Sequence, residues 1–440
     1  MDETKGPSTI NPSSTNSSTE VVEWNLKPEH ELRIETDDGK DKSLKLTLKE
    51  GTAELFGCEL LKGHTYEFPP SSKFAVFTWH GASITVSSHA KMVYVSEDTP
   101  MLSYVNTHDI LDKLRFAAQA KGKEGFGPRL MIMGPSDSGK STLARILLNY
   151  AVRSGWKPTF VDLDVGQNEI TTPGSLSATP VEHPVNVSDM GSISLKAPIV
   201  YYFGHASPSP YTNIYKKMTE RLAASLTKRM DALDIARHSG VVINTCGWVE
   251  GQGYELLIHA AAAFKVNVML VIGQDRLCNQ LKSDPRIAKM VSVIKLGKSG
   301  GVVERDADYR RKARSRRIRE YFYGPSGELC PHQKVVQFKD VNIYKVGGGV
   351  AAPSHALPLG AKPLLDPDRA VKVEPSVELM NMLLAVSFSK DPNTVLDSNV
   401  AGFLHVSNVN MEKKTLTLLC PAPGPLPERS LVMGTIKWTD

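Results

Sequence analysis

Short runs in which apolar and polar residues alternate dominate the chain from about residue 22 to residue 98. Examples are ELRIE, KFAVFTW and ASITVSS, and turn signals such as KEG, LKG and PPSS separate them. A period of two is typical of strands with one buried face, and many short strands at this spacing indicate a β-sandwich. We therefore expect a β-sandwich domain over residues 22–105. A Ser/Thr/Asn-rich stretch over residues 1–21 predicts a disordered tail in front of it.

The pattern changes in the middle of the chain to continuous apolar runs separated by stretches with helical spacing. The runs are RLMIM, TFVDLDV, GVVINTC, VNVMLVIG and VSVIKL. Such strands alternating with helices predict an α/β domain with a parallel sheet covered on both faces, and ligands bind at the carboxyl ends of its strands. We assign residues 106–324 to this domain, including a linking helix for which Thr107 is a plausible N-cap.

Beyond about residue 325 the chain returns to short β-like segments with Gly- and Pro-rich joints, such as VAGFLHVSNVN and TLTLLCPAPGPLP. We interpret residues 325–440 as a small, β-rich C-terminal domain of the α+β class, which carries no catalytic signal of its own. The predicted fold is thus a central P-loop kinase-like parallel sheet between two β-containing domains.

Composition narrows the functional classes. The net charge of the 440-residue chain is only +5, so a nucleic acid would have to bind to local patches. No stretch approaches the ~18 apolar residues of a membrane span, so we expect no membrane partner. Five scattered cysteines without a C-x-x-C pair favour reduced thiols in an intracellular compartment, and argue against a disulfide framework or a zinc site.

The segment GPSDSGKST, residues 134–142, carries the strongest chemical signal, because it matches the P-loop pattern G-x-x-x-x-G-K-[ST]. Gly134 and Gly139 permit backbone angles at which consecutive N–H groups surround a phosphate at the start of a helix. Lys140 would reach the β- and γ-phosphates, and Ser141 would offer its hydroxyl to Mg²⁺. A strand-like run precedes the loop and a helical run follows it, as nucleoside triphosphate binding requires.

Asp162 and Asp164 end the next predicted strand, FVDLDVGQ. Residues two apart on a strand point the same way, so one carboxylate could belong to the Mg²⁺ shell and the other could accept a proton from an attacking hydroxyl. The alternative is a pair of helix-capping residues. An Asp on the strand that immediately follows the P-loop helix suits a phosphotransferase better than a motor ATPase, and the guanine signature N-K-x-D of GTPases is absent.

Two further segments add candidate binding residues. In NTCGWVEGQGYE, Trp248 follows an apolar strand, and its indole could either stack on a base or fill the core beside Tyr254. In VVERDADYRRKARSRRIREYFYG, seven arginines lie between residues 305 and 319. Such a run is often a solvated helix, but Arg310 and Arg314 share one helix face and could neutralise a γ-phosphate. The same strip could attract an RNA backbone.

Taken together, GPSDSGKST, DLDVGQ, INTCGW, KSGGVVER and RIREYFYG resemble, in this order and spacing, the Clp-type polyribonucleotide 5′-hydroxyl kinases. The resemblance runs from about residue 31 to about residue 420. It implies an enzyme that uses ATP to phosphorylate RNA 5′ ends, in the nucleus, as part of the mRNA cleavage and polyadenylation machinery. In animals, members of this family also associate with the tRNA splicing endonuclease.

The resemblance also implies roles for individual residues. Asp164 would activate the RNA 5′-hydroxyl, and Trp248 would stack on RNA as the tryptophan of a T-x-G-W clasp. Glu31 and Lys73 would contact the adenine. The full set assigned to ATP is Glu31, Lys73, Gly134, Asp137, Ser138, Gly139, Lys140, Ser141 and Thr142. The set assigned to RNA is Gln167, Thr245 and Trp248, the metal set is Ser141, Asp162 and Asp164, and the catalytic set is Lys140, Asp164 and the lid arginines Arg305, Arg310 and Arg314.

Two other functions stay open at this stage. One is an ATP-bound scaffold without catalysis, because the family includes a fungal branch that binds ATP but has lost kinase activity. The other is a small-molecule nucleoside kinase, which the tryptophan and the arginine strip disfavour. Every motif of the family is intact in this chain, which favours an active enzyme.

Overall fold

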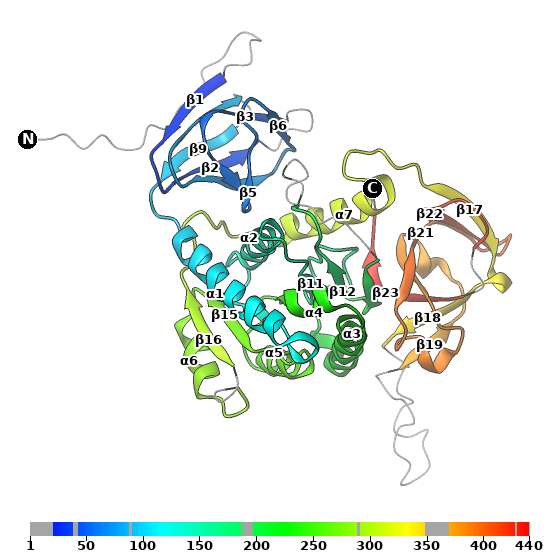
Figure 1. The fold of residues 1–440 in the computed structure, drawn as a ribbon. Coiled ribbons are helices and arrows are strands. Elements are labelled where there is room, and N and C mark those ends of the chain that lie inside the picture. The colour runs from blue at the N-terminus through cyan, green and yellow to red at the C-terminus, as the bar shows by residue number, and fades with distance from the viewer. Residues whose placement is uncertain are drawn as a thin grey trace, which may run out of the picture.

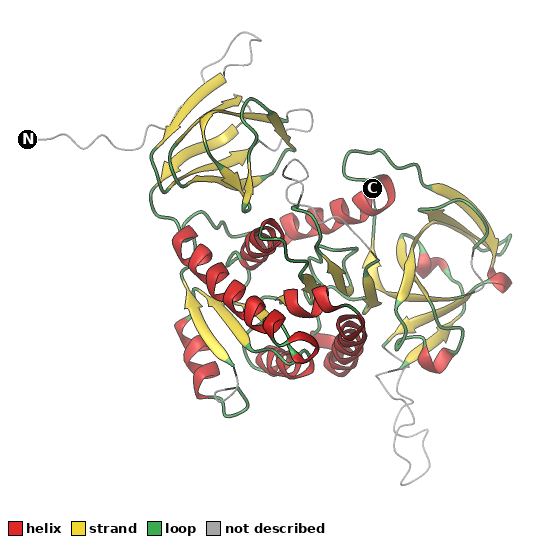
Figure 2. Cartoon of the chain, in the orientation of Figure 1, coloured by secondary structure: helices red, strands yellow, loops and turns green. Residues whose placement is uncertain are grey.

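The computed structural model describes residues 21–37, 43–87, 90–185, 187, 197–287, 291–347, 369–426 and 429–439. The described residues form an N-terminal β-domain, a central α/β domain and a C-terminal β-domain (Figure 1). Helices are concentrated in the central domain (Figure 2). The expected mixed α/β fold, with a β-sandwich before it and a β-rich domain after it, is confirmed. The expected tail lies outside the described residues, apart from residue 21.

The N-terminal domain consists of two antiparallel sheets with the strand orders β1-β8-β3-β6 and β5-β4-β7-β2-β9. Its strands are β1 Val21–Leu26, β2 His30–Thr36, β3 Leu44–Gly51, β4 Glu54–Leu55, β5 Cys58–Glu59, β6 Thr65–Phe68, β7 Lys73–Thr78, β8 Ala82–Ser87 and β9 Ala90–Ser96. The alternating sequence explains the packing: in β3, Leu44, Leu46 and Leu48 are buried while Lys45 between them is exposed. These leucines share one core with Leu32 of the other sheet.

The central sheet has the order β13-β12-β11-β14-β10-β15-β16. The five strands expected from the sequence are parallel neighbours: β10 Arg129–Met133, β11 Thr159–Asp162, β14 Val241–Asn244, β15 Val268–Ile272 and β16 Ser292–Leu296. The antiparallel strands β12 Ser175–Pro180 and β13 Ile199–Tyr202 extend one edge, and sequence reasoning missed both. The helices are α1 Met101–Ala120, α2 Lys140–Arg153, α3 Thr212–Ala232, α4 Asp234–Ser239, α5 Gln252–Ala263, α6 Asp275–Ser283 and α7 Ala307–Tyr323.

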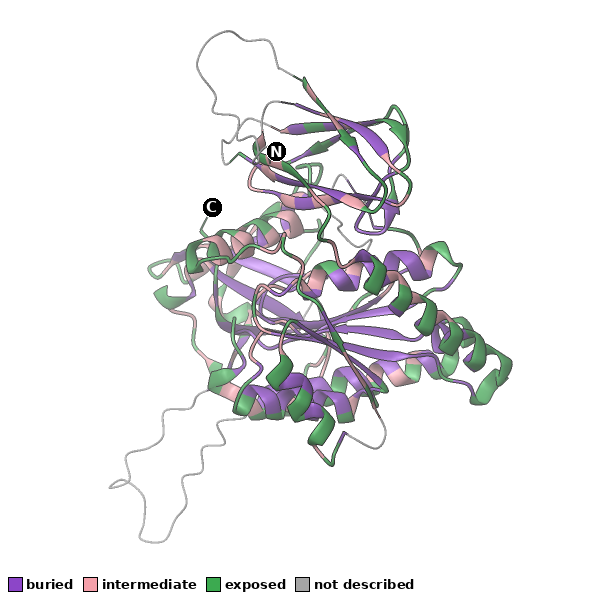
Figure 3. Ribbon diagram, turned by 90° about the vertical axis from the view of Figure 1, so that its left-hand side faces the viewer, coloured by how far each residue is buried: buried purple, intermediate pink, exposed green. Residues whose placement is uncertain are grey.

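Helices cover both faces of this sheet, and the central strand β10 is accordingly buried at every residue (Figure 3). Alternate residues of β10 point to opposite faces. Leu130 and Ile132 join a core with α1, α2 and the sandwich, whereas Met131 and Met133 join a second core with α3, α5, α7 and the C-terminal domain. The P-loop strand therefore lies between two cores that each continue into a flanking domain.

The linking helix α1 begins earlier than the sequence suggested. It starts at Met101, and Pro100 occupies the N-cap position. Thr107 lies inside the helix, buried, and its hydroxyl donates to the carbonyl of Ser103 at 2.7 Å. The prediction of Thr107 as the N-cap is therefore wrong, because Met101 and Tyr104 pack into the core and extend the helix toward the sandwich.

The C-terminal sheet has the order β17-β22-β21-β20-β23-β18-β19. Its strands are β17 His332–Gln337, β18 Asn342–Val346, β19 Ala370–Val373, β20 Met382–Ser387, β21 Val400–Asn410, β22 Thr415–Cys420 and β23 Ser430–Lys437. In the described residues after Gly324, the helical turns are of the 3-10 type, at Phe338–Asp340, Val377–Leu379 and Pro392–Thr394, and no α-helix occurs. The α-helical part expected for this domain is therefore wrong for its described residues, while its β-rich character is confirmed.

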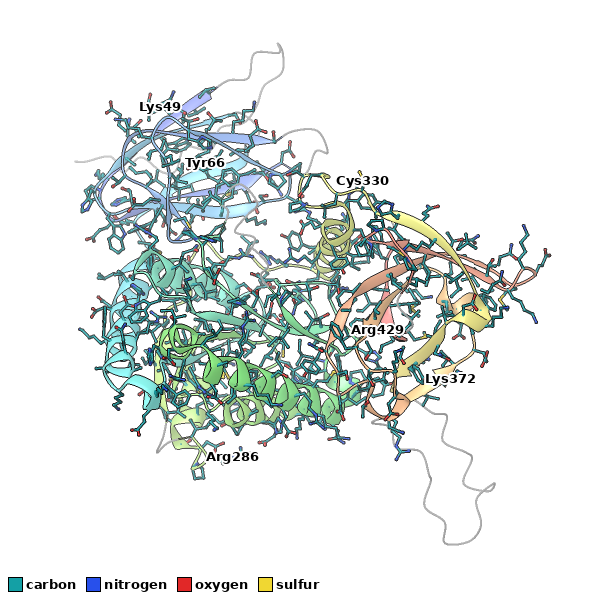
Figure 4. The ribbon with its side chains drawn as sticks, turned by 45° about the vertical axis from the view of Figure 1, so that its right-hand side comes forward. Lys49, Tyr66, Arg286, Cys330, Lys372 and Arg429 are labelled. Atoms are coloured by element: carbon teal, nitrogen blue, oxygen red, sulfur yellow. The ribbon has the colours of Figure 1, made fainter. Side chains whose placement is uncertain are left out.

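No helix in the described part of the chain is long and apolar enough to span a membrane. All five cysteines are free thiols. Cys330 is exposed on the segment that leads from α7 into the C-terminal domain, as Figure 4 shows, whereas Cys246 lies in the central domain beside the P-loop.

Candidate active site

A cavity of about 480 Å³ lies where the sandwich, the P-loop and the segment leading into α7 meet. This volume falls in the range of ~300–1,000 Å³ that is typical of small-ligand pockets. Fourteen of the seventeen residues assigned to ATP, RNA, metal or catalysis line this cavity, and Gly134, Asp162 and Thr245 do not. Those that line the cavity are Glu31, Lys73, Asp137, Ser138, Gly139, Lys140, Ser141, Thr142, Asp164, Gln167, Trp248, Arg305, Arg310 and Arg314.

The P-loop connects β10 to α2 with the geometry of a phosphate cradle. Gly134 and Gly139 have φ angles of 155° and 92°, and a Cβ at Gly134 would lie 2.8 Å from Oγ of Ser138. Lys140 is buried, and its Nζ donates to the carbonyls of Gly134 at 3.0 Å and Pro135 at 2.7 Å. Within the described part of the chain, the buried hydroxyl of Ser138 has no hydrogen-bond partner. The Ser138 hydroxyl is thus an unused donor beside the N-terminus of α2, where the phosphates of ATP would bind.

The two aspartates after the P-loop helix do not point the same way, because β11 ends at Asp162 and Asp164 lies beyond it. Asp162 is fully buried and accepts hydrogen bonds from the amides of Asp164 at 3.0 Å and Glu169 at 2.7 Å. Its side chain does not line the cavity. Asp164 does, and its Oδ1 accepts from the amides of Gly166 at 2.9 Å and Gln167 at 3.1 Å. The expectation of a strand-borne pair is therefore wrong, and Asp162 shapes the loop that presents Asp164.

The electrostatics of Asp164 suit proton transfer. Burial raises the pKa of its carboxyl, and the nearby Lys140 ammonium acts in the opposite direction. Burial likewise lowers the pKa of Lys140, which Asp164 counteracts. A carboxylate whose pKa is raised is a stronger base than an exposed aspartate, so Asp164 combines access to the cavity with the basicity that general-base catalysis uses.

Asn244, which sequence reasoning missed, connects the buried aspartate to the P-loop. It ends β14 in register with Asp162, and its Nδ2 lies 3.1 Å from Oδ1 of Asp162 and 3.5 Å from Oγ of Ser141. Ser141 and Asp164 line the cavity and offer oxygen atoms, the kind of ligand that Mg²⁺ prefers, while the Asn244 amide holds Asp162 and Ser141 from behind. The motif INTCGW contained the signal, because its asparagine also ends a strand at the same sheet edge.

The arginine strip is brought to the cavity as expected. Arg305, Arg310 and Arg314 all line it, from the segment before α7 and from the first half of α7. Nη2 of Arg310 donates to Oδ2 of Asp137 at 2.6 Å, and the amide of Arg305 donates to the same oxygen at 3.1 Å. We call residues 299–314 the lid.

Gly300 and Gly301 of the lid lie against Arg33, a second residue that sequence reasoning missed. This sandwich residue donates through Nη2 to the carbonyl of Asp98 at 2.5 Å and packs on the lid glycines. A Cβ at Gly301 would lie only 2.9 Å from Nε of Arg33. The glycines leave this space to the Arg33 side chain, so they reflect contact between the lid and the sandwich.

Trp248 is half-buried and lines the cavity, so it combines features of both interpretations weighed above. One side packs on the central core, and a Cβ at Gly253 of α5 would lie 2.5 Å from its Cγ. Thr245 differs from the prediction: it is 1% exposed, and its hydroxyl donates to the carbonyl of Ile132 at 2.8 Å. Thr245 therefore ties the clasp loop to β10 and does not face the cavity, whereas Gln167 does.

The sandwich contributes the wall of the cavity that adjoins the lid glycines. Glu31 is buried and its carboxylate accepts from Nε of Arg33 at 2.6 Å and from the hydroxyl of Thr99 at 2.8 Å. Lys73 forms an ion pair with Glu35. Both Glu31 and Lys73 line the cavity, together with aromatic residues such as Tyr94. Their contact with adenine stays a prediction.

Comparison with known proteins agrees with this arrangement. Three family models match successive parts of the chain: the N-terminal β-sandwich domain of polyadenylation factor at 25–118, the mRNA cleavage and polyadenylation factor CLP1 P-loop at 134–324, and the pre-mRNA cleavage complex II protein Clp1 at 329–440. The chain is 45% identical to human polyribonucleotide 5′-hydroxyl-kinase Clp1 over 421 residues, which cover 96% of this chain and 97% of that one. It is 44% identical to a CLP1 homologue of Arabidopsis thaliana over 420 residues, 94% of each chain.

Solved structures agree on the fold. A Clp1p–Pcf11p complex superposes with a TM-score of 0.83 at 24% identity, covering 96% of this chain and 99% of Clp1p. A second Clp1p–Pcf11p structure gives a TM-score of 0.82 at 22% identity, covering 96% and 100%. The family models span the sandwich, the P-loop domain and the C-terminal domain, and the relatives match over nearly their whole length. The chain therefore belongs to the Clp1 family of mRNA cleavage and polyadenylation factors.

Proposed function

We propose that this protein is an ATP-dependent polynucleotide 5′-hydroxyl kinase that transfers the γ-phosphate of ATP to RNA 5′ ends in mRNA 3′-end cleavage and polyadenylation. One observation carries the proposal: Lys140, Asp164, Trp248 and the lid arginines line the same cavity. A phosphate cradle, a base, a stacking surface and mobile cations are the parts that phosphoryl transfer to a polynucleotide needs. Relatives at about 45% identity bear the name polyribonucleotide 5′-hydroxyl-kinase.

The chain's own groups divide the reaction between them. The P-loop amides and Lys140 hold the phosphates of ATP. Asp164 accepts the proton of the RNA 5′-hydroxyl as its oxygen attacks the γ-phosphorus, and the bond from that phosphorus to the β–γ bridging oxygen breaks. Arg310 and Arg314 neutralise the charge on the transferred group, whose oxygens spread negative charge in the transition state.

We further infer that Mg²⁺ accompanies ATP at the corner formed by Ser141 and Asp164. In the part of the chain that the structure describes, His, Cys, Asp and Glu form no group of three or more that could hold a metal. This suits Mg²⁺, which typically takes one or two protein ligands and completes its shell with phosphate and water. Bound there, Mg²⁺ would neutralise charge on the phosphate oxygens.

RNA would reach the cavity between Trp248 and Gln167, with its terminal base on the indole. Stacking and backbone contacts are insensitive to sequence, so we propose recognition of the 5′ end and not of a particular base. We also propose a nuclear protein that acts with subunits of the cleavage machinery and with the tRNA splicing endonuclease. The Clp1p of the similar structures is bound to Pcf11p, which makes a protein of that kind the first partner to test.

The decisive experiment measures transfer of labelled γ-phosphate from ATP to a short 5′-hydroxyl RNA. Wild type is compared with Lys140→Ala and with the matched control Lys113→Ala, whose ammonium lies exposed on α1 and pairs with Asp109. We expect transfer by the wild type and the control and none by Lys140→Ala. Excess free nucleoside should not compete with the RNA, since competition would indicate a small-molecule nucleoside kinase.

A catalytically silent scaffold is the second candidate, and the interface between sandwich and P-loop helix favours it. Tyr150 and Arg153 of α2 contact Glu54 of the sandwich, and the cavity lies between the same two domains. A nucleotide bound there would hold the domains together without any turnover. Wild-type protein that binds ATP but transfers no phosphate to any RNA would support this function and contradict the kinase.

A further inference from the structure

Asp137 is an unusual residue for its place in the molecule. It carries a negative charge within a loop whose amides are arranged to bind an anion, and it has a left-handed φ angle of 54°. Its side chain is only 13% exposed. A carboxylate near phosphates is unfavourable unless a cation compensates it, so its side chain requires a positive partner.

That partner comes from the lid. Oδ2 of Asp137 accepts from Nη2 of Arg310 at 2.6 Å and from the amide of Arg305 at 3.1 Å. One carboxylate oxygen therefore holds both a lid side chain and the lid backbone, five residues apart. Charge-assisted hydrogen bonds of this length are the stronger kind in proteins.

The second half of α7 is anchored independently of Asp137. Ile318 and Phe322 are buried in the core, and Phe322 stacks on Trp438 of the C-terminal domain with ring centroids 5.7 Å apart. Nε1 of Trp438 donates to Oγ of Ser315 at 3.1 Å, and Nη2 of Arg317 donates to the carbonyl of Glu169. Figure 1 shows α7 lying between the N-terminal β-domain and the C-terminal β-domain. This half of the helix serves as a fixed base.

The first half of α7 has no such anchor. Its residues up to Lys312 are mostly exposed, and Asp308 pairs with Arg311 and Lys312 within the helix itself. In the described part of the chain, and apart from the backbone bonds that continue α7, the hydrogen bonds and ion pairs that join residues 303–313 to other segments all end on Asp137. Residues 299–302 of the lid lie against Arg33, but the position of the arginine-bearing part, 303–313, over the P-loop depends on this carboxylate.

We propose that Asp137 is the positioning residue of the lid, which holds Arg310 at the P-loop so that the γ-phosphate meets a guanidinium already in place. The proposal rests on the proposed kinase function and deepens it. A free arginine side chain loses rotamer entropy when it is ordered, so holding it beforehand lowers the cost of closing the site. The incoming phosphate then shares Arg310 with Asp137, and the departure of the phosphorylated product returns Arg310 to Asp137.

The test uses Asp137→Asn, which removes the charge with little change in shape, and the matched control Asp275→Asn, which removes an exposed carboxylate outside the lid that pairs with Lys295. Hydrogen exchange of the amides in 303–312 is measured for the full chain without nucleotide, alongside kcat and KM for RNA phosphorylation. For Asp137→Asn we expect exchange at least about tenfold faster and a kcat about tenfold lower, with the KM for RNA unchanged. The control should match wild type in all three.

A double-mutant cycle with Arg310→Gln separates positioning from a general structural effect. If Asp137 acts through Arg310, adding Asp137→Asn to Arg310→Gln should lower kcat no further. Arg310→Gln alone should also accelerate lid exchange, and it serves as the second variant if Asp137→Asn fails to fold. Additive losses of kcat, or lid exchange equal to wild type in both single variants, would overturn the proposal. Because exchange is measured without RNA, it decides the role of Asp137 even if the wild type proves to have no kinase activity.

Discussion

Replacing Asp164 with asparagine tests the chemistry most directly. The change is isosteric, and Oδ1 of the aspartate accepts from the amides of Gly166 and Gln167 at 2.9 and 3.1 Å. The amide oxygen of asparagine can accept both bonds, so the loop should keep its conformation. What disappears is the proton acceptor. General-base catalysis contributes about 10²–10⁴-fold to a rate, so we expect kcat to fall by that factor, which corresponds to a barrier about 3–5 kcal/mol higher.

The assay is single-turnover transfer of labelled γ-phosphate at saturating ATP and RNA, measured across pH. Burial raises the pKa of Asp164, and only the ionised form accepts a proton. The wild-type rate should therefore rise with pH through this raised pKa, and Asp164→Asn should lack that rise. Asp275→Asn, an exposed change on α6, is the matched control. A loss below about threefold, or an unchanged rise of rate with pH in Asp164→Asn, would refute the assignment of the base.

Three further changes probe the clasp, the domain interface and the P-loop. Trp248→Ala should raise the KM for RNA by about 5- to 150-fold, because base stacking contributes ~1–3 kcal/mol. The affinity for ATP, measured by titration, should stay the same. Equal loss of RNA and ATP binding would contradict the role of Trp248 in the clasp. Tyr150→Phe leaves the buried Glu54 without its hydroxyl donor. Denaturant titration should therefore show a free energy of unfolding reduced by about 1–3 kcal/mol. An unchanged unfolding midpoint would argue against this contact. Gly247→Ala places a Cβ 2.4 Å from the amide of Ser136, so calorimetry should show at least about tenfold weaker ATP binding; wild-type affinity would mean that the clasp loop can move away.

The P-loop was predictable because its signal is local. The spacing from Gly134 to Lys140 by itself determines where the chain can turn and where a helix N-terminus can begin. The domain order was equally predictable, since periods of two and continuous apolar runs distinguish a sandwich from a parallel sheet. The ends of helices and strands were harder to predict. The start of α1 at Met101 and the end of β11 at Asp162 depend on packing and pairing with distant segments.

What the sequence determined by itself is the inventory: a phosphate-binding loop, two carboxylates after it, a tryptophan on a glycine-flanked loop, and a strip of arginines. Tertiary structure decided which of these groups face the cavity. Asp162 turns inward because Asn244 on the neighbouring strand donates a hydrogen bond to it, and the Thr245 hydroxyl instead donates to a carbonyl of β10. Asp137 meets Arg310 only because the chain returns to the P-loop after 173 residues. Contacts over such separations follow from how strands pair and helices pack, and no local pattern encodes them.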